Sequence, residues 1–176
     1  VLLDKTLLKT LPRRHLLNGL CEIIKLAIIA DAELFDLLEL HGAECVGSRF
    51  QNAQSDITLD RAIAGMIKEL EPNLFEEELA RKVDFGHTFS YGLETRHEAN
   101  LLHGEAVLLD ILLSTLIARG RNLMTDDETS RVFRLTRELG FAIDASVLDP
   151  SLLCASLTER TYHRNGLQRV PMPRGI

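Results

Sequence analysis

The chain has 176 residues, of which 45% are hydrophobic, so it can bury the core of one ordinary domain and is not a disordered chain. Its 20 basic residues are outnumbered by 26 acidic ones, and the net charge of −6 lacks the basic excess typical of a nucleic-acid-binding protein. No apolar run approaches the roughly 20 residues that a membrane-spanning helix requires, so a membrane protein is not expected.

Three cysteines lie far apart in the sequence and form no Cys-x-x-Cys pair. Their odd number and apolar neighbours favour the reduced thiols of a cytoplasmic protein over a disulfide framework. These cysteines are Cys21, Cys45 and Cys154.

Helix signals occupy most of the chain when it is taken in order. Pro12 suits the first turn of a helix, Gly42 and Pro72 are expected to end helices, and Thr125 with Glu128 forms a capping box. The expected helices cover residues 15–30, 31–40, 57–71, 74–82, 87–96, 103–118 and 125–139, with one more short helix from 149.

Strand signals are confined to the two ends of the chain, residues 1–3 and 167–172. The alternation of strands and helices that marks a parallel sheet is missing, as is a Gly-rich nucleotide loop after a strand. The sequence therefore predicts one all-α domain.

Three of the expected helices carry polar residues inside apolar stripes, where an unpaired charge would cost free energy. On the first of them, Asn18, Glu22 and Lys25 are spaced by four and three residues and share one face. The same pattern also suits a simple ion pair between Glu22 and Lys25 at the edge of the helix.

The second such helix follows Gly86, which allows the backbone of another element to come close. His87, Tyr91 and Glu94 fall on one stripe of this segment. Taken alone, His87 also fits a hydrogen-bonded histidine of the core.

The third helix is the apolar segment 103–118, in which His103, Asp110 and Ser114 line one face. A histidine at the start of a helix also fits a solvated residue without a function. The three helices together supply one carboxylate and two histidines, a ligand set that suits a catalytic zinc-type site with an open position, or cobalt or iron.

Three ordered segments of the chain resemble the C-terminal domain of the dehydroquinate synthase family, the sugar-phosphate cyclases. They are residues 18–25 (NGLCEIIK), 84–89 (DFGHTF) and 102–107 (LHGEAV), and the likeness extends over nearly the whole chain. The resemblance implies an N-terminal α/β domain that binds NAD and a C-terminal helical domain that binds a divalent metal, zinc or cobalt.

The resemblance also implies a boundary between two parts of the chain, after residue 13. Residues 14–176 correspond to the helical metal- and substrate-binding domain, and residues 1–13 to a linker or the last strand of an NAD-binding domain that the chain lacks. The NAD-binding domain of the same polypeptide would then complete the active site, and the family implies a homodimer.

The family's metal ligands map onto Glu22, His87 and His103, and a lysine that contacts substrate maps onto Lys25. In these enzymes NAD oxidises a ring hydroxyl, phosphate is eliminated, the ketone is reduced again and an intramolecular aldol reaction closes a carbocycle. A metal ion bound to substrate oxygens would stabilise the negative charge that develops in such a reaction, and so would the ammonium group of Lys25.

Within the family, residues 70–74, 83–90 and 163–166 are most similar to the sedoheptulose 7-phosphate cyclases, which make valiolone-type cyclitols. Dehydroquinate synthase proper, the alternative, would have asparagine and histidine where this chain has Asp84 and Tyr91. The best-known sedoheptulose 7-phosphate cyclase has proline at the second of these positions.

The resemblance therefore places Asp84 and Tyr91 with Lys25 among the catalytic residues, with Tyr91 selecting the stereochemistry of the substrate. Arg81 stands one residue beyond the position at which an arginine is expected. The residues expected to bind substrate are Asn18, Arg81, His163 and Arg164. The last two fit exposed loop residues equally well.

Two functions of other kinds fit the sequence as well. A metal-dependent alcohol or glycerol dehydrogenase shares the two-domain architecture, but it would form NADH and release no phosphate. A helical interaction domain with coincidental histidines and glutamate would bind no metal.

Overall fold

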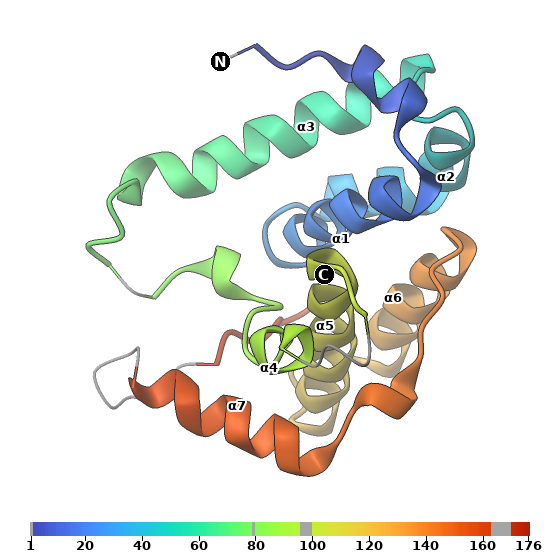
Figure 1. Ribbon diagram of the computed structural model, residues 1–176. Coiled ribbons are helices and arrows are strands. Elements are labelled where there is room, and N and C mark those ends of the chain that lie inside the picture. The colour runs from blue at the N-terminus through green and yellow to red at the C-terminus, as the bar shows by residue number, and fades with distance from the viewer. Residues whose placement is uncertain (1, 79, 96–99, 163–169) are drawn as a thin grey trace.

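The computed structural model describes residues 2–78, 80–95, 100–162 and 170–176 (Figure 1). His163 and Arg164, two of the expected substrate-binding residues, lie outside the described residues. The α-helices of the described part are α1 (Arg13–Ala30), α2 (Ala32–Gly47), α3 (Ala53–Leu70), α4 (Ser90–Glu94), α5 (His103–Gly120), α6 (Asp126–Glu138) and α7 (Pro150–Tyr162).

The all-α class is confirmed, because no described residue belongs to a strand. The expectation of strand-like ends is wrong at Leu2, Leu3 and residues 170–172, which have no regular secondary structure. A strand needs a neighbouring strand to pair its backbone groups, and the described part of the chain offers none. No helix among the described residues is long and apolar enough to cross a membrane.

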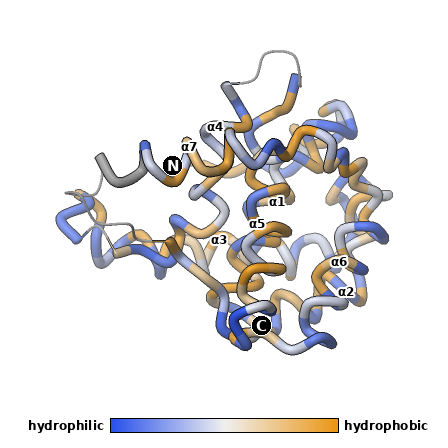
Figure 2. The backbone as a smooth tube through the Cα atoms, turned by 90° about the horizontal axis from the view of Figure 1, so that it is seen from below, coloured by the Kyte–Doolittle hydropathy of each residue, from blue (hydrophilic) through white to orange (hydrophobic). Residues whose placement is uncertain are grey.

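Helices α1 and α5 form the centre of the molecule (Figure 1). Helix α5 buries residues on every side and packs against α1, α4 and α6, while α1 also packs against α2 and α3. Figure 2 shows the largely hydrophobic α5 in the middle of the fold. The central buried helix expected over residues 103–118 is thus confirmed, and it extends to Gly120.

Side chains that precede the helices satisfy N–H groups of their first turns. Asp31 accepts a hydrogen bond from the N–H of Leu34 at the start of α2, and Asn52 accepts one from Ser55 at the start of α3. The capping box of Thr125 before α6 is formed as the sequence predicts. These caps fix where the helices begin.

Helix α2 continues through Gly42, so the expected stop at this residue is wrong. An internal glycine weakens a helix by only about 1 kcal/mol relative to alanine. Gly42 lies against Leu139, and a Cβ atom at Gly42 would come within 2.7 Å of the Leu139 side chain. Packing between α2 and the end of α6 therefore outweighs the weak helix preference.

The expectation of a helix over residues 74–82 is also wrong. After α3 the chain forms a single 3-10 turn, Glu71–Asn73 (η2), which contains Pro72. The Asn73 side chain then donates to the carbonyl of Glu78 at 2.6 Å and accepts from its N–H at 3.0 Å. These side-chain bonds to the backbone close a loop in place of a helix.

The helix expected from His87 begins only at Ser90, where α4 starts. Asp110 of α5 accepts hydrogen bonds from the N–H groups of Phe89 and Ser90, the latter at 3.0 Å. A carboxylate on another helix thus caps α4. His87 consequently lies in the segment between α4 and the 3-10 turn Lys82–Asp84 (η3).

Candidate metal centre

Glu22 lies in the middle of α1 and directs its two carboxylate oxygens to different partners. Oε2 forms an ion pair with the ammonium group of Lys25, which is only 4% exposed. Oε1 is buried, yet it accepts no hydrogen bond from any residue that the structure describes. A buried carboxylate oxygen without a donor is costly, so a cation would satisfy Oε1.

His87 reaches this carboxylate because Gly86 brings its segment against α5. Gly86 has a positive φ of 77°, and a Cβ atom there would lie 3.0 Å from side-chain atoms of Val107 and Ile111. The close approach that the sequence predicts at Gly86 is therefore confirmed. The Nδ1 atom of His87 lies 3.1 Å from the carbonyl oxygen of Phe85.

His103 is the first residue of α5, and its neighbour holds α5 against α1. The N–H of Gly104 donates to Asn18 Oδ1 at 2.7 Å. A Cβ atom at Gly104 would lie only 2.0 Å from the backbone oxygen of Asn18, so the two helices cross here at a glycine. Asn18, expected to bind substrate, joins the helices directly beside His103.

A salt bridge holds the same crossing of α1 and α5. Arg14 donates to both carboxylate oxygens of Glu105, at 2.6 and 2.7 Å, and Glu105 also accepts from the N–H of Leu102 at 2.8 Å. Sequence reasoning missed this pair, because its members are 91 residues apart. The position of Glu105 in the first turn of α5 is the one signal that could have indicated its role.

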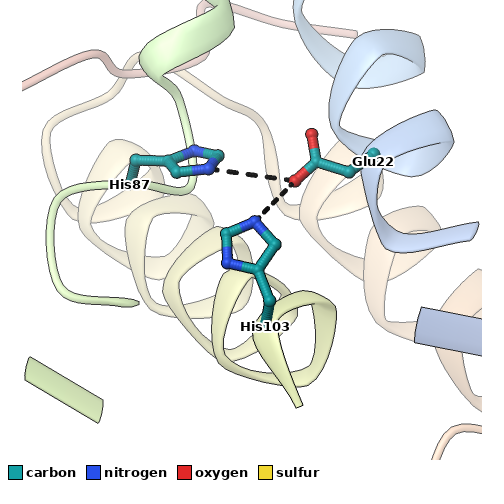
Figure 3. Close-up of side chains that lie close together, drawn as sticks. All are labelled: Glu22, His87 and His103. Carbon is teal, nitrogen blue, oxygen red and sulfur yellow. Dashed lines mark ion pairs between the residues drawn. The ribbon is translucent and has the colours of Figure 1, made fainter. Parts of the chain in front are cut away.

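The three predicted ligands come together, as Figure 3 shows. The Nε2 atoms of His87 and His103 lie 3.8 and 3.5 Å from Glu22 Oε1. All three ligand atoms lie within 4.8 Å of one another. Donor atoms about 2 Å from a tetrahedral ion stand about 3.4 Å apart, so this spacing fits an ion such as Zn²⁺.

The protonation of His87 also suits a cation at this point. A carbonyl oxygen only accepts hydrogen bonds, so Nδ1 of His87 carries the proton of the neutral ring and Nε2 directs a lone pair at Glu22 Oε1. Burial lowers the pKa of His87, and the nearby charge of Lys25 lowers it further. The neutral imidazole, the form that binds a metal, is therefore favoured.

Arg81 and Asp84 lie just before this segment and are paired with each other. Arg81 Nη2 donates to Asp84 Oδ1 at 2.7 Å, and Nη1 pairs with Glu76 at 2.5 Å. Both line a cavity of about 900 Å³ whose walls also include Phe85 and residues 170–176. The three candidate ligands are not among the residues that line this cavity, but the N–H of His87 donates to the carbonyl oxygen of Asp84 at 3.0 Å.

Helix α4 carries two further residues of interest. Tyr91, predicted to be catalytic, is 62% exposed, while Ser90 and Leu93 of the same helix are buried. Glu94, to which sequence reasoning gave no role, places Oε1 3.1 Å from Nδ1 of His103. Only the position of Glu94 on the stripe of His87 pointed toward the site.

Comparison with protein families finds one matching domain. A family model described as 3-dehydroquinate synthase C-terminal matches residues 19–161.

Curated relatives match over almost all of the chain. The 2-epi-5-epi-valiolone synthase of Streptomyces hygroscopicus subsp. jinggangensis is 46% identical over 181 residues, which covers 99% of this chain and 44% of the relative. The demethyl-4-deoxygadusol synthase of Trichormus variabilis is 35% identical over 184 residues, with coverages of 100% and 45%. The chain thus spans less than half the length of these relatives.

Solved structures of related enzymes also match the chain. A structure of 2-epi-5-epi-valiolone synthase from Streptomyces hygroscopicus subsp. jinggangensis 5008, with NAD⁺ and Zn²⁺ bound, matches with a TM-score of 0.94 and 48% identity. The match covers 98% of this chain and 48% of that one. A 2-deoxy-scyllo-inosose synthase complexed with carbaglucose-6-phosphate, NAD⁺ and Co²⁺ shares the fold, with a TM-score of 0.63 at 19% identity over 88% of this chain and 42% of that one.

Proposed function

Since the chain belongs to the 3-dehydroquinate synthase C-terminal family, we propose that it is the metal- and substrate-binding part of a sugar-phosphate cyclase. The reaction converts sedoheptulose 7-phosphate to a valiolone-type cyclitol, with phosphate elimination and an intramolecular aldol closure. The identity of 46% with a 2-epi-5-epi-valiolone synthase supports this substrate class. The observation that carries the proposal is the convergence of one carboxylate and two imidazoles in such a chain.

In this proposal Glu22, His87 and His103 hold a divalent ion, zinc or cobalt. Two observations support this assignment: Oε1 of Glu22 accepts no hydrogen bond from any described residue, and burial lowers the pKa of His87. When bound, the ion acts as a Lewis acid toward oxygens of the substrate. NAD is held mainly by an N-terminal domain of the same polypeptide, with residues 1–13 as the linker to it, and the protein acts as a homodimer.

The remaining roles concern charge and orientation at the substrate. The buried ammonium of Lys25 stabilises negative charge that develops on a substrate oxygen. Asp84 and Tyr91 take part in catalysis, while Asn18 and Arg81 bind the substrate. Arg81 already pairs with two carboxylates, so a substrate phosphate would compete with these partners.

The test uses the full-length protein with NAD⁺ and either Zn²⁺ or Co²⁺. Sedoheptulose 7-phosphate and the dehydroquinate precursor are offered in parallel, and phosphate release, product mass and NADH absorbance are followed. Phosphate and a cyclitol mass from sedoheptulose 7-phosphate, with no net NADH, are expected. Turnover of the dehydroquinate precursor alone would indicate dehydroquinate synthase proper, and net NADH without phosphate would indicate a dehydrogenase.

The metal site is tested separately by metal content. Glu22→Gln, His87→Asn and His103→Asn are each expected to lose most of the bound ion, because each removes one of three ligands. Exposed Glu138 on α6 and half-buried His41 on α2 supply the matched controls Glu138→Gln and His41→Asn. Full occupancy in all three ligand variants would exclude this site.

A further inference from the structure

The imidazole ring of His103 lies between two carboxylates. Its Nε2 atom faces Glu22 Oε1 at 3.5 Å, as Figure 3 shows, and its Nδ1 atom lies 3.1 Å from Oε1 of Glu94. Glu94 is the last residue of α4, and His103 is the first residue of α5. The two contacts therefore join three separate helices through one ring.

The chemistry of the two partners determines which nitrogen carries the proton. An ionised carboxylate can only accept hydrogen bonds, so the contact with Glu94 requires a proton on Nδ1. In the neutral ring Nε2 then has a free lone pair, and it is directed at Glu22. This is the tautomer in which Nε2 can bind a metal ion.

From this geometry we propose that Glu94 is the positioning residue of His103. Its carboxylate fixes the tautomer and direction of the ring and raises the basicity of Nε2. The inference rests on the proposed metal site and adds a residue that acts on the ion through His103. Partners of this kind orient metal-binding histidines in many proteins, and their loss weakens metal binding by 10- to 100-fold.

The difference in burial between the two histidines explains why the ring of His103 needs a side chain to orient it. The side chain of His103 is 50% exposed, whereas that of His87 is 31% exposed and its Nδ1 faces the backbone carbonyl of Phe85. Packing therefore restrains the ring of His103 less than that of His87. A substitution can remove the partner of His103, but none can remove a backbone carbonyl.

The test measures Zn²⁺ affinity of the full-length protein by competition with a chromophoric chelator, and the visible absorption of the Co²⁺-loaded protein. Glu94→Ala is expected to weaken Zn²⁺ binding by about 10- to 100-fold and to change the Co²⁺ spectrum. Glu94→Gln retains an oxygen that accepts from Nδ1, so it should restore most of the affinity. Thermal unfolding of the metal-free proteins shows whether each variant is folded.

Glu138→Ala is the matched control, because Glu138 is also an acidic last residue of a helix and contacts no histidine among the described residues. It should bind Zn²⁺ as the wild type does. Wild-type affinity in Glu94→Ala, or an equal loss in Glu94→Ala and Glu94→Gln, would overturn the role of Glu94. Absence of binding by the wild type would instead refute the metal site itself.

Discussion

At the scale of single residues, the two carboxylate oxygens of Glu22 face two different cations, the ammonium group of Lys25 and the proposed metal ion. Oε2 is paired with Lys25, and Oε1 is left for the site between the histidines. Both positions depend on the same negative charge, so the buried ammonium of Lys25 is held within a few ångströms of the proposed ion. A substitution of Lys25 can therefore test its role in catalysis without removing a ligand of the metal ion.

Lys25→Met is expected to lower kcat by about 10²–10³-fold, because it removes a charged donor that stabilises developing negative charge. The bound metal should remain, since all three ligands are intact. The assay is turnover of sedoheptulose 7-phosphate together with metal content. Lys9→Met, at an exposed lysine of the 3-10 turn Lys5–Thr10, is the control that should keep wild-type kcat. An unchanged kcat in Lys25→Met would remove Lys25 from the mechanism.

Glu22 and His103 could be predicted as candidate ligands because polar residues are conspicuous in apolar helices, whereas His87, which lies outside a helix, was indicated by its match to a family motif. Glu22 shows this most clearly, since Leu20, Cys21 and Ile24 beside it in its helix are buried. The roles of Glu94 and Arg14 could not be predicted in the same way. Each acts through a contact with a residue on a different helix, and helical periodicity carries no information about such contacts.

At the scale of helices, the site depends on how closely α1 and α5 cross. Gly104 allows this crossing, because a Cβ atom at this position would lie only 2.0 Å from the backbone oxygen of Asn18. Glu22 is one turn beyond Asn18, and His103 directly precedes Gly104. The distance between two candidate ligands is thus set by a residue that has no side chain.

Gly104→Ala is expected to destabilise the protein by about 2–3 kcal/mol, since the new methyl group meets backbone that cannot rotate away. It should also weaken metal binding by separating Glu22 from His103. Urea unfolding and Zn²⁺ affinity of the full-length protein measure both effects. Gly19→Ala on α1 is the control, because a Cβ atom there meets nothing within 4 Å, and it should be neutral or stabilise by up to about 1 kcal/mol. Equal stability of the two variants would contradict this account of the crossing.

Long helices were predictable from apolar spacing and caps, and short segments were not. The sequence places α5 and α6 correctly, but it extends α4 back to His87. The start of α4 is decided by the carboxylate of Asp110, 20 residues beyond Ser90. Burial raises the pKa of Asp110, although the hydrogen bonds from Phe89 and Ser90 oppose the rise.

At the scale of the whole molecule, a charged network joins α2 to α6. Arg131 donates to Asp36 and Glu39, and its guanidinium carbon lies 5.0 Å from the centroid of the Phe35 ring. Arg134 adds a further bond to Glu39 at 3.1 Å. Burial raises the pKa of Glu39, but the hydrogen bonds from Arg131 and Arg134 outweigh it and leave the pKa below its usual value.

Stability should consequently fall in acid. A carboxyl group whose pKa is lower in the folded chain contributes fully above its ordinary value, 4.5 for Glu39, and loses the contribution as pH falls through the lowered value. Asp31, held by Arg61, acts in the same direction below its ordinary value of 3.8. In urea unfolding between pH 7 and 3, Glu39→Gln should have a free energy of unfolding about 1–2 kcal/mol lower than that of the wild type at pH 7. This difference between variant and wild type should disappear below pH 4.

Glu138→Gln serves as the control for this experiment, because Glu138 forms no ion pair with any described residue. Its stability should follow that of the wild type across the whole pH range. A gap between Glu39→Gln and the wild type that stays constant with pH would contradict the role of Glu39.

The exposed position of Tyr91 has a consequence for how such a chain can evolve. It is the second residue of α4, and N–H groups in the first turn of a helix have no acceptor within the helix, so proline is tolerated there. Exchange of an exposed side chain typically changes the free energy of unfolding by less than about 0.5 kcal/mol. Mutations at position 91 can therefore accumulate with little effect on folding. Under the proposed catalytic role of Tyr91, selection at this position is free to act on the reaction rather than on stability.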